Sequence, residues 1–326
     1  MKLLSRIVAI FLGAALFAVL LFVTFFPLQR PAPDLQVQET PELVERGRYL
    51  AVNVLQCVDC HSERDWTFYG GPPREPLGAG RACMTRETAA TGVSAGQTHF
   101  PGRMCIRNIT PDKETGIGAW TDGEIIRAVR EGVNRDGEGL FPIMPYFIYS
   151  HVADEDMEAV VAYLRTLQPV KSVRPERDID FPMSLLVRLL PRPADSPAKA
   201  PDRSDSVAYG EYLATIGRCK FCHTPKKPRS TEGYPGRDFA GGIPFFLNGR
   251  TMYTMNLTPH ESGLGNWSRE QFVQLFKSRA ERRPTAETDN TLMNWNAFGA
   301  MTEEDLGALY DFFMSLPPVP YQEEPV

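Results

Sequence analysis

Two pentapeptides carry the residue types needed for covalent cofactor chemistry. Cys57-Val58-Asp59-Cys60-His61 and Cys219-Lys220-Phe221-Cys222-His223 both read C-x-x-C-H. Two thiols at this spacing can each add to one vinyl group of a haem, and the adjacent imidazole then becomes an axial ligand of the iron. The sequence therefore predicts two covalently bound haem c groups. The predicted attachment residues are Cys57, Cys60, Cys219 and Cys222, and the predicted iron ligands are His61 and His223.

Cysteine pairs of this spacing also occur in zinc sites and in redox-active dithiols. Zinc would need four clustered nitrogen or sulfur ligands, whereas the two pairs lie in separate parts of the chain. A dithiol does not require the histidine that follows both pairs. Both alternatives remain open, but haem attachment explains the complete pentads better.

The surroundings of the pentads repeat as well. Gly47-Arg48-Tyr49-Leu50 corresponds to Gly210-Glu211-Tyr212-Leu213 before them, and Asn108–Trp120 corresponds to Asn256–Trp267 after them. Both copies close with apolar residues at helical spacing behind an acidic first turn, as the helix dipole favours. The chain therefore contains a duplicated module. We expect Gly47 and Gly210 to let the first helix of each module cross closely against its last.

This pattern resembles the cytochrome c fold, a small helical domain with a haem pentad near its first helix and a methionine ligand before its last. More narrowly, the arrangement N-[IL]-T-P, G-[IL]-G-x-W and M-P-[YW] resembles the multihaem cytochrome c subunits of membrane-bound dehydrogenases for alcohols, aldehydes and gluconate. The resemblance covers about residues 43–170 and 205–320. It implies an all-α fold class with two tandem cytochrome c domains.

The resemblance also suggests the sixth ligand of each iron. Met144, in the segment PIMPY, matches the family's ligand loop, and Met293 aligns with it. The second copy departs from the pattern at Asn294, where the first has Pro145, so Met301 is a rival ligand there. Packing in the core is the alternative for each methionine. Trp120 and Trp267 hold equivalent positions and either donate to haem propionates or serve packing alone.

Cys83 and Cys105 are the two cysteines that haem attachment does not use. Both lie in the segment between pentad and Asn-x-Thr-Pro motif that is longer in the first copy than in the second. In an oxidising compartment such a pair favours a disulfide. Two free buried thiols are the alternative.

The N-terminus predicts a membrane anchor. No charged residue lies between Ile7 and Phe26, and at about 1.5 Å per residue this run spans a roughly 30 Å hydrocarbon core. A cleaved signal peptide is the alternative, although no small-residue cleavage site follows. Lys2 and Arg6 precede the run and favour a cytoplasmic N-terminus. We expect a single-pass protein of the inner membrane with its haem domains on the periplasmic side.

Proline-rich segments divide the 326 residues. We expect a cytoplasmic stub, anchor and linker over 1–40, a first cytochrome c domain over 41–170, a linker over 171–204 and a second domain over 205–326. Within the linker, Phe181–Leu190 is apolar but too short to span a bilayer. It lies along the membrane face or fills the cleft between the modules. The net charge of -5 disfavours a nucleic-acid partner.

These features favour an electron-transfer protein over an enzyme. Two six-coordinate irons would leave no open position for substrate. The resemblance implies redox protein partners: a dehydrogenase as donor, and a cytochrome, quinone or oxidase as acceptor in the respiratory chain. One alternative is a dihaem peroxidase, which needs an iron that can bind peroxide. Another is the cytochrome subunit of a haem–copper oxidase.

Overall fold

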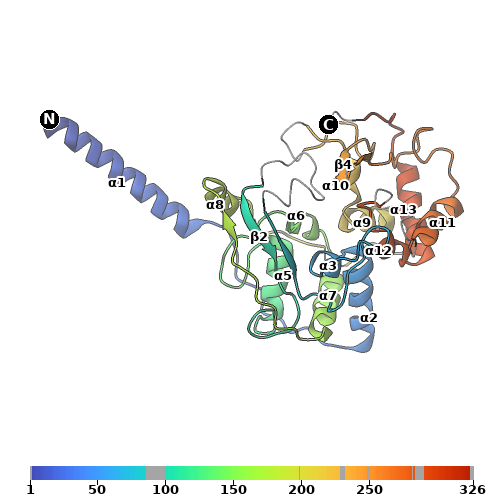
Figure 1. Ribbon diagram of the computed structural model, residues 1–326, viewed down its shortest axis with the longest axis horizontal. Coiled ribbons are helices and arrows are strands. Elements are labelled where there is room, and N and C mark those ends of the chain that lie inside the picture. Colours follow the sequence, from blue (N-terminus) through green and yellow to red (C-terminus); the bar gives the residue numbers. More distant parts are fainter. Residues whose placement is uncertain are drawn as a thin grey trace.

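The computed structural model describes residues 2–323, apart from residues 86–99, 198, 228–231, 248–249, 281 and 283–289. Helix α1 (Lys2–Phe25) projects from one end of the molecule, and the rest of the described chain lies beyond it along the longest axis (Figure 1). Its window Ser5–Phe22 is long and apolar enough to cross a membrane. A signal sequence would meet the same criterion.

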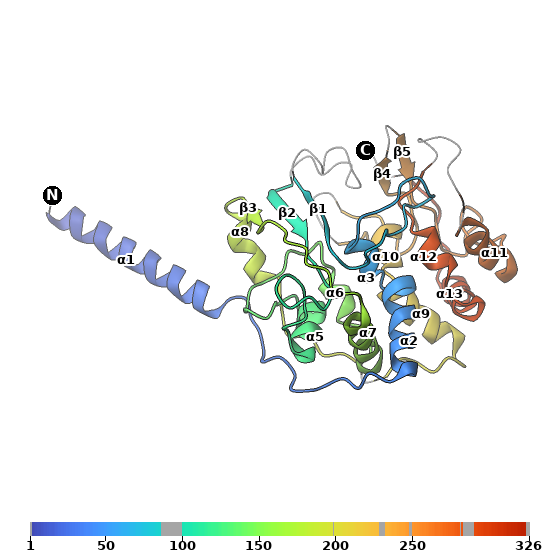
Figure 2. The same cartoon turned by 60° about the horizontal axis from the view of Figure 1, so that its bottom comes forward.

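The repeat predicted from the sequence appears as a repeated order of elements (Figure 2). The first module contains α2 (Pro41–Tyr49), the π-helical turn η1 (Leu50–Val54), α3 (Cys57–Cys60), β1 (Arg81–Met84), β2 (Gly102–Ile106), α5 (Asp122–Glu131), α6 (Tyr146–Tyr149) and α7 (Asp154–Thr166). The connection contains β3 (Asp178–Ile179), α8 (Met183–Leu186) and the 3₁₀ turn η2 (Val187–Leu189). The second module contains α9 (Ser206–Ile216), α10 (Cys219–His223), β4 (Pro244–Leu247), β5 (Arg250–Tyr253), α11 (Arg269–Arg279), α12 (Trp295–Gly299) and α13 (Glu303–Ser315).

Equivalent helices begin at equivalent capping residues. Thr121 and Glu124 form a capping box at the start of α5, and Ser268 and Gln271 form one at the start of α11. In each box, the hydroxyl accepts a hydrogen bond from the backbone N–H of the third helical residue. The longer side chain of that residue accepts one from the backbone N–H of the cap residue. The segment that follows the Asn-x-Thr-Pro motif therefore enters its helix in the same way in both modules.

The first and last helices of each module cross at a glycine. A Cβ atom on Gly47 of α2 would lie 1.8 Å from the Ala159 carbonyl oxygen of α7. One on Gly210 of α9 would lie 1.9 Å from the Ala308 carbonyl oxygen of α13. No larger side chain fits at either crossing without moving backbone, so the prediction made from the paired glycines is confirmed.

The all-α expectation was wrong. Strands β1, β2 and β3 form an antiparallel sheet, and β4 and β5 form a second one. In each module a strand pair lies between the pentad and the Asn-x-Thr-Pro motif, where extended backbone finds hydrogen-bond partners across a hairpin. The sequence held a signal for it: β4 and β5 flank Asn248-Gly249, a dipeptide favoured in two-residue hairpin loops.

The modules are joined by reciprocal tyrosine contacts. Tyr49 of α2 donates to Asp305 at the start of α13 over 2.7 Å, and Tyr212 of α9 donates to Asp156 of α7 over the same distance. Burial, together with the neighbouring carboxylate, raises the pKa of both phenols and keeps them as donors. Buried apolar residues of both modules also form one continuous core. The first helix of each module therefore also contacts the last helix of the other module.

Replacement of Gly210 by alanine should test the helix crossing. Because the new methyl group would collide with backbone, Gly210→Ala should lower the free energy of unfolding by about 1–3 kcal/mol. Urea unfolding followed by far-ultraviolet circular dichroism measures the change. The control is Glu211→Ala, at the exposed next position of the same helix. Equal stability of the two variants would contradict the close crossing.

Candidate cofactor-attachment sites

Both pentads begin from the same unusual backbone turn. Gln56 and Arg218, the residues directly before them, have positive φ angles of 59° and 65°. A short helix follows in each case, α3 and α10, which brings the two cysteines onto one helical face. The carbonyl groups of His61 and His223 then accept the backbone N–H of Gly80 and Gly241 over 2.7 and 2.8 Å. Left-handed backbone therefore turns the first helix of each module directly into its pentad.

Each pentad histidine is held by a backbone carbonyl. Nδ1 of His61 lies 2.7 Å from the Arg107 carbonyl oxygen, and Nδ1 of His223 lies 2.7 Å from that of Met255. Burial lowers the pKa of both imidazoles, against the opposing effect of the carbonyl, and so favours the neutral form that binds metals. With Nδ1 occupied, Nε2 is the nitrogen left for an iron.

The repeated Asn-x-Thr-Pro motif fixes the loop that supplies those carbonyls. Asn108 accepts from the backbone N–H and the hydroxyl of Thr110 over 2.9 and 2.7 Å, and it donates to the Val170 carbonyl over 2.7 Å. Asn256 makes the same bonds with Thr258 and Val319. Arg107 and Met255 directly precede these asparagines. Sequence reasoning missed their role because a backbone acceptor requires no particular side chain.

The pentad thiols do not suit a zinc site or a redox-active dithiol. Burial raises the pKa of Cys57 and of Cys219 to about 12, which disfavours the thiolate that a reactive dithiol or a zinc site needs. Within the part of the chain that the structure describes, no group of three or more His, Cys, Asp or Glu residues is placed to hold a metal ion. Thioether formation with a haem is the chemistry that the pentads fit.

The two candidate methionines occupy matched loops. Met144 and Met293 are half-buried beside the core, and the carbonyl of each accepts the backbone N–H of the residue two positions on, over 2.8 Å. Met301 is only 1% exposed and lies within the core, as does its counterpart Val152. The structure therefore gives Met301 a packing role. The positions of Met144 and Met293 are compatible with ligation of an iron, and this ligation remains a prediction.

Two buried polar atoms lie next to these loops without a protein partner. Among the described residues, the Tyr146 hydroxyl and the Trp295 indole N–H make no hydrogen bond, although the residues are only 3% and 7% exposed. They stand at equivalent positions, two residues after Met144 and Met293. Buried donors normally find an acceptor, so both fit a bound group that brings acceptors of its own, as haem propionates do. The sequence had pointed to Trp120 and Trp267 for this role.

The two pentads adjoin each other at a polar junction. The Arg218 guanidinium donates to the Gln56 side chain over 2.9 Å, which joins the residues directly before the two pentads. Its charge also acts on Cys60 and Cys222, one cysteine of each pentad. Asn294 donates to Gln56 and accepts from Arg64 over 2.6 Å. The position where the second copy departs from the family pattern thus serves contact between the modules.

One carboxylate of the first pentad is buried near this junction. Asp59 is 2% exposed, and burial raises its pKa to about 6. The charges of Arg64 and Arg218 oppose that shift. The second pentad has Phe221 at the equivalent position, 44% exposed. The surroundings of the two pentads therefore differ in charge.

The remaining cysteines form a disulfide between strands. Cys83 of β1 and Cys105 of β2 are directly paired in the hairpin and linked through their sulfur atoms. Cys57, Cys60, Cys219 and Cys222 are free thiols. The disulfide closes the base of the longer hairpin of the first module, and all four pentad cysteines stay available for haem.

Comparison with known proteins identifies relatives of the chain, although no family model matches it. It is 31% identical over 303 residues to the alcohol dehydrogenase (quinone) cytochrome c subunit of Gluconacetobacter polyoxogenes, covering 86% of this chain and 58% of that protein. It is 30% identical over 294 residues to the gluconate 2-dehydrogenase cytochrome c subunit of Pantoea cypripedii, covering 86% and 60%. A diheme cytochrome c-type protein of Cereibacter sphaeroides is 31% identical over 200 residues, covering 58% and 62%.

The chain thus spans about three fifths of the length of these relatives. The resemblance predicted from the pentads and the Asn-x-Thr-Pro motifs is confirmed.

Removal of the Asn294 side chain should test the junction. Asn294→Ala removes the hydrogen bond that Gln56 accepts and the one that Arg64 donates. Because both bonds are partly shielded from water, the variant should have a free energy of unfolding about 1–3 kcal/mol lower. Urea unfolding of the variant measures the loss. Asn266→Ala, at an exposed position outside the junction, is the control and should match the unchanged protein. A neutral Asn294→Ala variant would show that the junction bonds do not hold the modules together.

Proposed function

The chain is a homologue of the cytochrome c subunits of alcohol and gluconate dehydrogenases, and from that premise we propose that it is a dihaem electron carrier and not a substrate-oxidising enzyme. Its two haems would be joined through thioethers to Cys57 and Cys60 and to Cys219 and Cys222. A haem supplies one-electron chemistry at its iron. The residues of the chain hold it, orient its ligands and set its surroundings.

Each iron would be held between a histidine and a methionine of the same module. His61 pairs with Met144, and His223 pairs with Met293. The carbonyls of Arg107 and Met255 fix the orientation of the imidazoles. Tyr146 and Trp295, whose buried donors have no protein partner, would donate to the polar edge of the bound group. Because this ligand set would leave neither iron an open position, it favours electron transfer over substrate binding.

The contact between the pentads carries the relay proposal. Arg218 and Gln56, which directly precede the two attachment sites, are hydrogen-bonded to each other. Because the residues directly before the two attachment sites are in contact, both haems would lie within a single folded unit. An electron that enters at one module could then pass to the other within the chain.

We further place this carrier at the periplasmic face of the inner membrane. Helix α1 would be an uncleaved single-pass anchor, as its apolar length supports, and Lys2 and Arg6 in its first part favour a cytoplasmic N-terminus. The donor would be a dehydrogenase, as the names of the relatives suggest. The acceptor would be a component of the respiratory chain.

Substitution of each methionine tests the ligand set and the function together. The two pentads predict two covalent haems per chain. Methionine ligation keeps ferric haem low-spin and gives a weak near-infrared band, so the intensity of this band should correspond to two haems. Met144→Ala or Met293→Ala should each remove about half of the band, lower one reduction potential and open one iron to carbon monoxide. Acid–acetone extraction, near-infrared spectroscopy and potentiometry measure these effects.

Met301→Ala is the matched control and should leave the band intact. If it alone abolished the second band, the ligand in the second module would be Met301. A high-spin haem that binds peroxide in the unchanged protein would favour a peroxidase over a carrier. Fewer than two covalent haems would contradict the dihaem proposal.

The charge of Arg218 should influence both haems. A positive charge favours the reduced iron, which carries less charge, so Arg218→Leu should lower both reduction potentials. Arg218→Lys retains the charge and should largely restore them. Spectroscopic redox titration measures the potentials, with Lys220→Gln as an exposed control from the second pentad. A shift of one potential only would show that Arg218 serves a single module.

A further inference from the structure

The segment that connects the modules exposes a dense apolar surface. Six large apolar side chains lie between residues 181 and 190, each at least 36% exposed: Phe181, Met183, Leu185, Leu186, Leu189 and Leu190. We call this set the α8 patch. The expectation that this segment fills the cleft between the modules does not fit this exposure. Water is a poor solvent for so many adjacent apolar groups, and such patches mark interaction surfaces.

The α8 patch lies on folded structure. Strand β3, just before it, pairs with β2. Val187 is 2% exposed, and its carbonyl oxygen lies close to Gly139 of the first module. One apolar side chain of the segment thus anchors it while six face outward. The exposure is therefore fixed by the fold of the first module.

The patch lies where the apolar helix leaves the modules. Nε of Arg188 donates to the carbonyl oxygen of Phe26 over 3.0 Å. Phe26 is the last residue of the uncharged run, so Arg188 lies beside the end of the hydrocarbon-spanning segment. Figures 1 and 2 both show α8 next to the end of α1 that meets the first module. The α8 patch therefore lies beside the end of the anchor that meets the modules.

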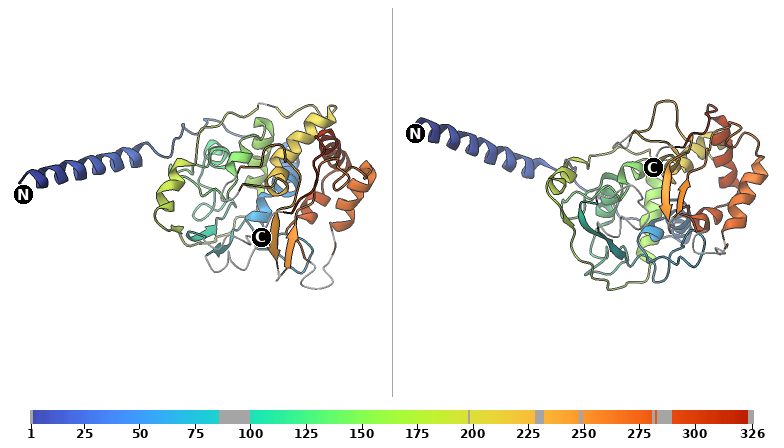
Figure 3. Two further views of the ribbon diagram at one scale, coloured as in Figure 1. Left: turned by 90° about the horizontal axis from the view of Figure 1, so that it is seen from above. Right: turned by 45° about the horizontal axis from the view of Figure 1, so that its top comes forward.

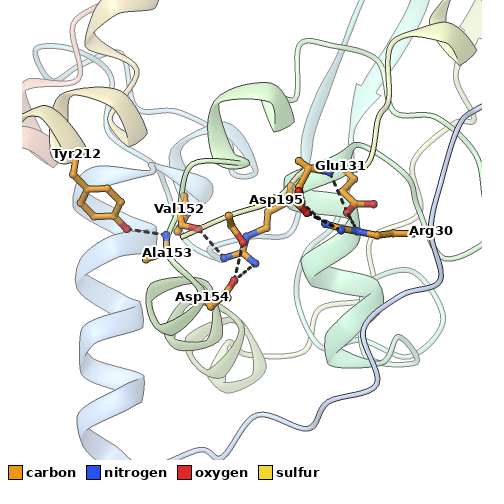
Figure 4. A network of polar contacts seen from close by, with 10 residues as sticks. Arg30, Glu131, Val152, Ala153, Asp154, Asp195 and Tyr212 are labelled. Atoms are coloured by element: carbon orange, nitrogen blue, oxygen red, sulfur yellow. Dashed lines mark hydrogen bonds and ion pairs between the residues drawn. The ribbon is translucent and has the colours of Figure 1, made fainter. Parts of the chain in front are cut away.

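The chain between α1 and the first module is also held in place. Arg30 pairs with Glu131 at the end of α5 over 2.6 Å and with Asp195 over 3.1 Å. Figure 4 shows Arg30 between these two carboxylates. The backbone N–H of Val37 donates to Asp122 over 2.9 Å. These contacts hold the chain that follows α1 against the first module and the connecting segment.

The charges around the patch suit a lipid surface. From Phe181 to Ala194 the chain carries Arg188 and Arg192 and no acidic residue, while Asp180 and Asp195 directly flank this range. Asp195 is paired with Arg30. Apolar side chains at the acyl boundary with arginines at headgroup level are the features of an interfacial membrane segment. A soluble partner would have to cover the patch beside a helix that itself lies in lipid.

From this placement we propose that Phe181–Leu190 is a second membrane contact, which lies in the interface of the bilayer beside α1 and holds the first module against it. The proposal rests on the proposed role of α1 as an anchor. In Figure 3, α8 lies at the end nearest α1, whereas α11 and α13 lie at the opposite end. The second module would therefore face away from the membrane.

Photo-crosslinking of the full-length protein in phospholipid vesicles tests this. Benzoylphenylalanine would replace Leu186 in the patch, Leu12 in α1, or Val207 of the second module, which are 45%, 65% and 40% exposed. Each variant should retain both haems, which confirms that it has folded. Lipid adducts detected by mass spectrometry are expected at Leu186 and Leu12 and are absent at Val207.

The outcomes separate this inference from the anchor on which it rests. Adducts at Leu12 without adducts at Leu186 would overturn the second contact and leave the anchor intact. Adducts at neither position would mean that α1 is not in the bilayer, and both proposals would fail. A crosslink from Leu186 to another copy of the chain would show that a protein surface covers the patch. Equal lipid adducts at Leu186 and Val207 would contradict the orientation.

Discussion

The bond from each pentad histidine to a backbone carbonyl is the constraint on which the rest of the structure depends. An imidazole can face an iron reliably only if its other nitrogen is held. Holding it requires the Arg107 and Met255 carbonyls to lie 2.7 Å away. Much of the repeated sequence serves this requirement. The asparagine of each Asn-x-Thr-Pro motif fixes the loop from one side, and Gly80 and Gly241 approach it closely from the other.

Duplication explains the likeness of the modules, and their contact explains where they differ. The tyrosine bridges are reciprocal, since each module supplies one phenol and one carboxylate. The junction between the pentads is not reciprocal, because Gln56 meets Arg218 and Asn294 replaces the proline of the first copy. Two identical residues at a shared axis would bring like groups together. Divergence at this point lets a donor meet an acceptor across the junction.

The sequence was informative where function needs particular side chains. The pentads, the duplication and the crossing glycines each impose a residue type. The structure confirms the crossings, and the names of the relatives agree with a haem protein. The hairpins were missed although Asn248-Gly249 signalled one of them. The acceptors for His61 and His223 could not be predicted, because any residue supplies a carbonyl. The contacts of Tyr49 and Tyr212 with the opposite module could not be predicted either, since helical periodicity carries no information about the partner surface.

The attachment of α1 to the first module bears on the direction of electron flow. A flexible tether would let either module approach the bilayer. Here Arg30, Val37 and Arg188 tie the end of α1 to the first module, and Tyr212 ties that module to the second. The distance of each attachment site from the membrane would then be set by the fold. In the orientation that we propose, the first haem would lie nearer an acceptor in the bilayer than the second haem would. The order of the pentads along the chain would then also be their order away from the bilayer.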